Sequence, residues 1–310
     1  MANNSDATKP GPVNIQGEAP QNIHISAIVA TMGRDKEICP LLNSFRRQSR
    51  PIDEIVVVDQ NNDDRMTKAL QDYPDLPIHH IHDPTLRGAN KSRNHGWRIS
   101  KGDFIFFPDD DCYYPDDFIE KFLNKISKTG ADIITGRCPE GRGGRYENEA
   151  LWVDRRTVWT TQVEWTLVCK RAVLETVSGF DENLGVGAET FWGAGEVQDL
   201  SLKAMACGFR EYYDPEIVAH HPPLNLGTMD SQHIKRFTTY STGVGYIFVR
   251  HGYPFTFAAY FILRSLGTIG KAALKGERAK MFYGWCVFKN RLRGYLRARR
   301  EITRYQPPST

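Results

Sequence analysis

Short β-branched runs alternate with helical stretches in the N-terminal part of the sequence, and this alternation constrains the fold more than any other feature. "HISAIVAT" (24–31) and "DEIVVVDQ" (53–60) predict strands, and "EICPLLNSFRRQ" (37–48) between them predicts a helix. Continuous apolar runs are typical of strands that are buried on both faces of a mostly parallel sheet. We therefore expect an α/β fold.

The same pattern continues along the chain. "IHHIHD" (78–83) and "GDFIFFPDDD" (102–111) predict a third and a fourth strand, with a helix over "GANKSRNHGWRIS" (88–100) between them. The stretch 115–130 predicts a helix that begins at Pro115 and Asp116 and ends before Gly130. In such sheets, ligands bind beyond the carboxyl ends of the strands.

Further elements follow less regularly. "ADIITGRC" (131–138) predicts another strand, and the Gly- and Arg-rich stretch 141–156 predicts a loop. A Gly-rich loop then leads into a helix that begins near Glu196, and "REYYDPEIVAHHPP" (210–223) predicts the end of the sheet domain.

Composition divides the chain into four parts. Residues 1–22 are polar and rich in Pro, Gly and Asn, which predicts a disordered lead and not a signal peptide. Residues 23–225 form the expected α/β domain, 226–304 a basic and mainly helical C-terminal extension, and 305–310 a tail.

The extension concentrates positive charge. Residues 264–304 contain twelve Lys or Arg and two Glu, although the net charge of the whole chain is only +3. The last predicted helix places apolar side chains on one face, and these are Trp285, Phe288, Leu292, Tyr295 and Leu296. A basic amphipathic helix predicts peripheral contact with an anionic membrane, and no nucleic acid partner is expected. The alternative is a helix packed on the catalytic domain with a solvated basic face.

Neither a spanning helix nor a disulfide framework is predicted. The longest apolar stretch of the extension, "FTFAAYFIL", has nine residues, which is too short to cross a bilayer. Six scattered cysteines lack paired ligand spacing, which argues against a zinc site and fits a reducing compartment. We expect a cytoplasmic protein, peripheral at most on the inner face of a membrane.

Three consecutive carboxylates, Asp109, Asp110 and Asp111, follow the fourth predicted strand. A divalent cation binds such strand-end carboxylates together with substrate phosphate oxygens. The alternative is a turn followed by a helix cap, in which Asp is common. A second strand-end carboxylate, Asp59, favours the cation site.

Several other chemistries do not fit the residues. An aspartyl phosphatase needs Thr where Tyr113 stands, and a calcium loop needs Gly where Tyr114 stands. No Gly-x-Gly-x-x-Gly follows the first strand, and the sequence contains no Walker loop. Nucleotide binding through a Gly-rich phosphate cradle is therefore excluded.

Five motifs in order, "ATMGR", "EIVVVDQNNDD", "GANKSRNHGWRISKGDFIFFPDDD", "GAGEVQDLSL" and "VAHHP", resemble glycosyltransferase family 2 over roughly residues 23–223. The resemblance implies the GT-A fold, a Rossmann-like sheet with flanking helices. It also implies a nucleotide-diphosphate-sugar donor, a divalent cation (Mn²⁺ or Mg²⁺) and an inverting displacement at the anomeric carbon. A glycan or lipid-linked intermediate is the expected acceptor.

The resemblance also implies roles for individual residues. Asp111 is the expected direct metal ligand, with Asp109 beside it, and His221, or else His220, approaches the metal or the diphosphate. The residues expected around the nucleotide and the donor sugar are Thr31, Arg34, Asp59, Arg93, Asn94, Asp109, Asp110, Trp192 and Arg236. Arg236 lies in "QHIKRF", a short likeness to the Gln-x-x-Arg-Trp motif of processive synthases.

Two departures from the family pattern affect these assignments. Gln60 stands where many members have a second Asp, so contacts to the base can differ. Val197 stands where the catalytic base is usual, within Glu-Val-Gln-Asp-Leu. Glu196 and Asp199 lie three residues apart at a helix start and face the same side. We predict Glu196 as the base, with Asp199 orienting it or a nearby Arg; the alternatives are Asp199 as the base and a capping pair without catalytic work.

Two other functions remain open at this point. A sugar nucleotidyltransferase also has a Rossmann-like sheet, but the Gly-rich phosphate loop that it needs is missing. A non-enzymatic carbohydrate- or nucleic-acid-binding module could use the acidic cluster only to bind calcium.

Overall fold

The computed structural model describes residues 23–140, 146–222 and 231–308, and for residues 231–238 it describes the backbone alone. Within these residues the strands are β1 (Ile25–Thr31), β2 (Glu54–Asp59), β3 (Ile78–His82), β4 (Phe104–Phe106), β5 (Ile133–Arg137), β6 (Leu151–Trp152), β7 (Val168–Lys170) and β8 (Glu211–Val218). The α-helices are α1 (Cys39–Arg46), α2 (Arg65–Leu70), α3 (Ala89–Ile99), α4 (Phe118–Thr129), α5 (Val158–Thr161), α6 (Arg171–Val177), α7 (Glu196–Ala206), α8 (Ser231–Arg250), α9 (Phe255–Leu274) and α10 (Arg278–Glu301). Two short 3₁₀ helices, η1 (Lys36–Ile38) and η2 (Glu164–Thr166), complete the set.

The described strands form one mostly parallel sheet in the order β3-β2-β1-β4-β7-β5-β8-β6. The strands β3, β2, β1 and β4 run parallel to one another, and β5 and β8 form a second parallel pair. Between the two groups, β7 is antiparallel to both of its neighbours. The expected strands of the N-terminal half are confirmed, whereas β7 was not anticipated from the sequence.

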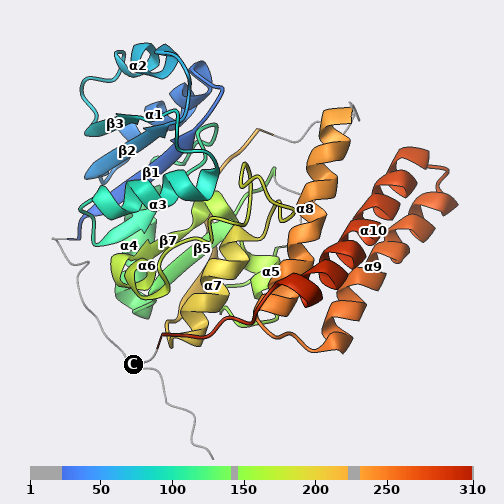
Figure 1. The fold of residues 1–310 in the computed structure, drawn as a ribbon. Coiled ribbons are helices and arrows are strands. Elements are labelled where there is room, and N and C mark those ends of the chain that lie inside the picture. The colour runs from blue at the N-terminus through green and yellow to red at the C-terminus, as the bar shows by residue number, and fades with distance from the viewer. Residues whose placement is uncertain (1–22, 141–145, 223–230, 309–310) are drawn as a thin grey trace, which may run out of the picture.

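Helices cover both faces of this sheet (Figure 1). One core contains side chains of α1 and α4, such as Phe45 and Phe122, and the other contains side chains of α3, α6 and α7, such as Trp97, Leu174 and Leu200. In α3, Gly96 allows close packing on the sheet, because a Cβ there would lie 2.4 Å from Cγ2 of Ile28. The expected mostly parallel sheet with flanking helices, and with helices added at the C-terminus, is confirmed.

The C-terminal helices form a third layer with a core of their own. Figure 1 shows α8 between the sheet domain and the pair formed by α9 and α10. Aromatic side chains, among them Tyr246, Phe248 and Phe261, fill this core together with Trp192 from the sheet domain. None of the described helices is long and apolar enough to cross a membrane.

Some expected boundaries differ in the structure. The helix expected from Pro115 begins at Phe118 instead, while Gly130 ends it in the left-handed conformation as expected. β4 has only three residues, because Pro108 beyond it has no N–H for the ladder. The expected loop 141–156 contains the short strand β6, and residues 141–145 lie outside the described part of the chain.

Two other expectations cannot be compared directly with the structure. The expected lead, residues 1–22, and the expected domain boundary at 225 both lie outside the described residues. In the tail, the N–H of Tyr305 donates to the carbonyl of Arg250, and residues 309–310 are outside the description.

The apolar face expected on the last helix is divided in the structure. Tyr295 of α10 is buried in the third core, whereas Trp285, Leu292 and Leu296 are exposed. The helix instead turns small residues such as Gly294 toward α8, where a Cβ would lie 2.3 Å from the carbonyl oxygen of Thr242. Close backbone packing therefore rotates α10 away from the orientation that its large apolar residues predict.

Candidate active site

The three aspartates lie in a loop that connects the carboxyl end of β4 to α4. An isolated parallel bridge links Asp109 to Ala30 near the end of β1, and an antiparallel bridge links Tyr113 to His220 beyond β8. Two backbone hydrogen bonds of 3.0 and 2.9 Å form the second bridge. These contacts bring the acidic loop and the two late histidines together.

Asp111 and His221 meet directly. Nε2 of His221 lies 3.1 Å from Oδ1 of Asp111, and the ring of His221 stacks on Trp165 with 4.6 Å between centroids. Burial alone would lower the pKa of His221, but the hydrogen bond and charge of Asp111 raise it. Burial would likewise raise the pKa of Asp111, but His221 and Arg34 outweigh it and lower that pKa to about 2. Asp111 is therefore held as a carboxylate.

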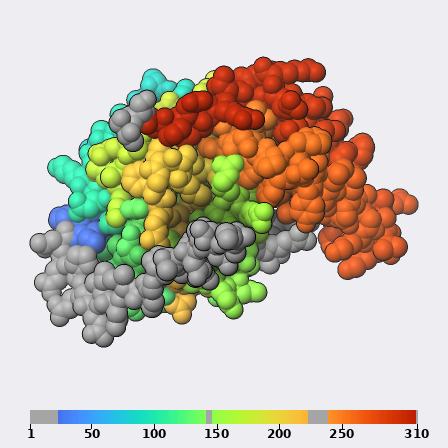
Figure 2. Space-filling model, turned by 90° about the horizontal axis from the view of Figure 1, so that it is seen from below, coloured from blue at the N-terminus to red at the C-terminus, as the bar shows by residue number. Residues whose placement is uncertain are grey.

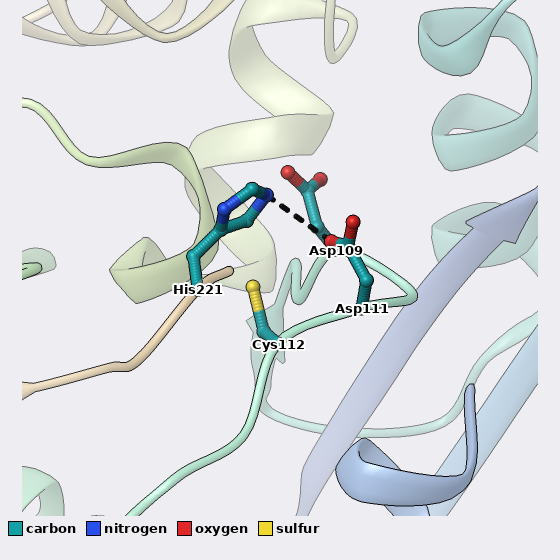
Figure 3. A group of neighbouring side chains, drawn as sticks. All are labelled: Asp109, Asp111, Cys112 and His221. Carbon is teal, nitrogen blue, oxygen red and sulfur yellow. Dashed lines mark ion pairs between the residues drawn. The ribbon is translucent and has the colours of Figure 1, made fainter. Parts of the chain in front are cut away.

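A group of four side chains has the spacing of a metal site. Asp109, Asp111, Cys112 and His221 can each offer one ligand atom, and these atoms all lie within 4.8 Å of one another. Figure 3 shows the two carboxylates and the imidazole pointing toward one another, with the thiol of Cys112 beside them. Burial raises the pKa of Cys112 well above its usual value, so the thiol stays protonated and is a poor ligand for a hard cation.

Thr31, the last residue of β1, and Arg34 beyond it bind the middle of the triplet. The hydroxyl of Thr31 donates to Oδ2 of Asp110 at 2.7 Å, and the guanidinium of Arg34 contacts Oδ1 of Asp110 at 3.0 Å and also pairs with Asp111. Burial raises the pKa of Asp110 to about 6, against the effect of Arg34 and Thr31. The structure thus brings four predicted donor-site and metal-site residues into one cluster.

Arg93 of α3 lies on the other side of the acidic loop. Its guanidinium contacts Oδ1 of Asp109 at 3.0 Å and pairs with Glu164, a residue of η2. Arg93 is 5% exposed, and burial alone would lower its pKa, but Glu164, Asp109 and Glu196 raise it. A buried cation therefore connects the metal-site residues electrostatically to the predicted base.

Glu196 is the first residue of α7 and follows Gly195. Its Oε1 accepts a hydrogen bond of 3.1 Å from the N–H of Val186. Gly185, at φ +100°, makes room for this carboxylate, because a Cβ there would lie 2.2 Å from Oε1 of Glu196. The Gly-rich loop thus packs directly on the predicted base at the start of α7.

Asp199 is fully buried one turn further along α7. Its Oδ1 lies 2.8 Å from Nε2 of His251, and its Oδ2 lies 3.1 Å from Nζ of Lys203. Burial alone would raise the pKa of Asp199, but Lys203 and His251 lower it. The partners of Asp199 are thus a lysine and a histidine, and it joins α7 to the end of α8. Its role in orienting Glu196 or a nearby Arg stays a prediction.

Four other predicted donor-site or metal-site residues lie in settings of their own. The buried carboxylate of Asp59 accepts from the N–H of Asn61 at 2.8 Å and lies 3.2 Å from Nε2 of His80. The side-chain amide of Asn94 joins α3 to Phe180 and Glu182, with bonds of 2.9 and 3.0 Å. Trp192 is packed against Tyr246 of α8, and His220 contacts Glu140 at 2.8 Å. Their roles in donor or metal binding stay predictions.

Arg236 cannot be placed as a side chain. It belongs to α8, but its side chain is outside the described part of the chain, and so is any contact that it makes. Its assignment to the diphosphate also stays a prediction.

Three neighbours of the site were missed by the sequence analysis. Cys112 directly follows the triplet, and a strand-end position was the only signal that could have identified it. Glu164 and Trp165 lie in a short segment without periodic pattern, and only their contacts with Arg93 and His221 show that they belong to the site.

Comparison with solved structures identifies the fold. The chain is similar to the mannosyltransferase PcManGT from Pyrobaculum calidifontis in complex with GDP-Man and Mn²⁺, with 14% identity, a TM-score of 0.59, and coverage of 94% of this chain and 80% of that one. It is also similar to residues 1–349 of TarS from S. aureus in complex with UDP, with 19% identity, a TM-score of 0.55, and coverage of 88% and 92%. The fold is that of the GT-A glycosyltransferases.

Sequence comparison then gives the family. Residues 26–169 match "Glycosyl transferase family 2". The uncharacterized glycosyltransferase YwdF of Bacillus subtilis is 36% identical over 227 residues, which cover 69% of this chain and 82% of that relative. An uncharacterized glycosyltransferase of Haemophilus influenzae is 37% identical over 105 residues, and this match spans only 35% of that relative. The chain belongs to glycosyltransferase family 2 and is an enzyme of the glycosyltransferase class.

Proposed function

We propose that this enzyme transfers a sugar from a nucleotide-diphosphate-sugar donor to a hydroxyl group of a glycan or lipid-linked acceptor, with inversion and with the help of a divalent cation. The observation that carries the proposal is the convergence of Asp109, Asp111 and His221 beyond the end of β4. Strand-end carboxylates of this kind suit a donor diphosphate with its cation. The similar PcManGT structure holds GDP-Man and Mn²⁺, which supports both the donor class and the ion class.

The residues present fit a hard divalent cation. Two carboxylates and one imidazole supply oxygen and nitrogen ligands, and the low pKa of Asp111 keeps one of them ionised. Asp111 and Asp109 would hold Mn²⁺ or Mg²⁺, with His221 beside them. When bound, the cation would neutralise the charge of the leaving diphosphate.

The remaining steps are assigned to this chain's own residues. The acceptor oxygen attacks the anomeric carbon while its proton passes to the carboxylate of Glu196, and the bond from that carbon to the diphosphate oxygen breaks. Arg34 and Arg93 place positive charge beside the acidic loop, where the diphosphate would lie. The contact between Val186 and Glu196 holds the base in position.

The acceptor and the cellular location belong to the same proposal. The basic C-terminal helices suit an enzyme that contacts an anionic membrane and takes a lipid-linked acceptor. Five cysteines are free thiols, namely Cys39, Cys112, Cys169, Cys207 and Cys286, which suits a reducing compartment such as the cytoplasm.

Incubation with a panel of labelled nucleotide-diphosphate sugars tests the proposed reaction. We expect slow release of the nucleoside diphosphate from one donor in the presence of Mn²⁺ or Mg²⁺, and loss of this release in excess chelator. Release of pyrophosphate would instead support a nucleotidyltransferase. A protein that binds sugar but turns over no donor would support a binding module.

A further inference from the structure

Helix α9 is apolar on both of its faces. Its buried face, which includes Phe261 and Ile262, packs on α10 and the third core. A stripe of exposed residues at helical spacing runs along the outward face, and the exposed Arg264 and Lys271 border it; the stripe contains Thr256, Tyr260, Leu263, Gly267, Gly270 and Leu274. Leu274 is 91% exposed and Tyr260 67%. An exposed stripe without charge along a helix of this length indicates a surface that another apolar phase covers.

The start of α10 lies at the same end of the hairpin, beyond the turn that follows Leu274. Phe282 and Trp285 are exposed there, close in the chain to Leu274 and the turn that joins the two helices. Figures 1 and 2 show this end of the hairpin projecting from the rest of the molecule. Gly284 of α10 packs on Ile269 of α9, so Phe282, roughly 200° round the helix from Gly284, faces away from α9. We therefore call the outward residues of α9 alone the hairpin surface.

Positive charge surrounds the hairpin surface. Between residues 255 and 289 the chain carries Arg264, Lys271, Lys275, Arg278, Lys280 and Lys289. Glu277 is the one acidic residue in this range of the sequence, and it is paired with Lys280 at 3.0 Å. Apolar and aromatic side chains bordered by Lys and Arg are the composition of helices that lie in the interface of an anionic bilayer.

We propose that the hairpin surface docks on an anionic lipid bilayer, with the outward face of α9 inserted among the headgroups and acyl chain ends. This inference assigns the membrane contact to α9 and the hairpin end, and not to the apolar residues of α10 as a whole. It rests on the proposed function, because docking would give the enzyme access to a lipid-linked acceptor.

Charge decides between a bilayer and a second copy of the chain. In a symmetric dimer through this surface, the same patch of both copies would meet, so the basic residues of the two copies would be brought close together. Like charges at that distance repel, whereas anionic lipid headgroups neutralise them. The observations therefore favour lipid as the occupant.

Vesicle flotation of the full-length chain tests the proposal. We expect the protein to float with phosphatidylcholine vesicles that contain phosphatidylglycerol at low salt, and to float less as salt is added or phosphatidylglycerol is left out. Leu263→Glu and Leu274→Glu should each lower the partition coefficient about tenfold or more. Lys275→Ala should lower it about fivefold.

Matched variants and a second readout make the result decisive. Ile99→Glu on α3 and Lys128→Glu on α4 also alter exposed residues, and both should float as the unaltered protein does. Cation-dependent release of nucleoside diphosphate, measured without vesicles, should be equal in all variants, so failure of docking and failure of the proposed reaction are distinguishable.

The proposal is overturned if the protein does not float at low salt, or if Leu263→Glu and Leu274→Glu float unchanged. It is also overturned if sedimentation shows a dimer that Leu274→Glu dissociates and that does not float.

Discussion

Oδ1 of Asp199 lies 2.8 Å from Nε2 of His251, and both side chains are buried. Asp199 belongs to the helix that begins with the predicted base, and His251 follows the last residue of α8. The C-terminal extension is thus joined to α7 by a buried polar contact, to which Lys203 of α7 adds an ammonium group. The extension therefore contributes to the geometry of the sheet domain.

We predict that Asp199→Asn destabilises the fold. The amide cannot balance the buried ammonium of Lys203, and removal of one partner of a buried ion pair costs about 3–5 kcal/mol. The free energy of unfolding, from urea titrations followed by circular dichroism, measures the loss. Asp72→Asn, which alters an exposed carboxylate, serves as the control and should leave stability nearly unchanged. Equal stability of the two variants would contradict the prediction.

The same pair predicts a dependence of stability on pH. The pKa of Asp199 is lowered in the folded state from its ordinary value of 3.8, so the folded state binds the proton less readily than the unfolded state. Its contribution is complete above the ordinary pKa and is lost as the pH falls from that value through the folded-state pKa. The difference in stability between the unaltered protein and Asp199→Asn should therefore shrink below about pH 4. A difference that grows under acid conditions would show that the assigned sign is wrong.

A separate prediction concerns the base. Glu196→Gln should retain donor binding and lose sugar transfer, because the amide keeps the shape of the side chain but cannot accept the proton. Calorimetric titration with the donor measures binding, and product formation from donor and acceptor measures transfer. Asp199→Asn serves as the comparison, because Asp199→Gln would also enlarge the side chain. When each variant is assayed at a temperature at which it is fully folded, Asp199→Asn should keep more activity than Glu196→Gln. The opposite order, with Asp199→Asn folded and inactive, would make Asp199 the base.

Strands buried on both faces could be predicted from the sequence. The run that forms β2 is apolar over several successive residues, and such a run has few alternatives in an α/β chain. β7 could not be predicted, because its three residues carry no periodicity and its position depends on pairing with β4 and β5. The local sequence pattern thus predicts the parallel strands, whereas the antiparallel strand β7 depends on pairing with segments that are distant in the sequence.

Some residues of the candidate site could likewise be predicted from the sequence, and others could not. The aspartate triplet is contiguous, so its place at a strand end was visible in the sequence. The partners of these carboxylates come from distant segments, such as His221 beyond β8 and Arg34 after β1. His251 lies 52 positions from Asp199, and Trp165 has no pattern that links it to His221. Contacts of this kind follow from the fold and have no signature in the local sequence.

A further prediction concerns the cation. Mn²⁺ should raise the melting temperature of the unaltered protein, because an ion that binds only the folded state stabilises it. Asp111→Asn removes the carboxylate whose pKa is lowered to about 2 and should abolish most of this shift. Asp72→Asn again provides the control, and its shift should equal that of the unaltered protein. An undiminished shift in Asp111→Asn would place the ion elsewhere.

The last prediction concerns the buried guanidinium of Arg93, which pairs with Glu164 and Asp109. In a double-mutant cycle, Arg93→Met and Glu164→Gln should be coupled by about 0.5–3 kcal/mol, because each change alone leaves a buried group without its partner. The free energies of unfolding of the four proteins measure this coupling.

The exposed pair of Arg46 and Asp75 offers a matched cycle, with Arg46→Met and Asp75→Asn. Solvent screens that pair, so its coupling should be much smaller. If Arg93 also positions the acidic loop for the donor, Glu164→Gln should weaken donor binding although Glu164 is not a metal ligand. Equal coupling in the two cycles, together with unchanged donor binding in Glu164→Gln, would reduce Arg93 and Glu164 to an ordinary ion pair without influence on the site.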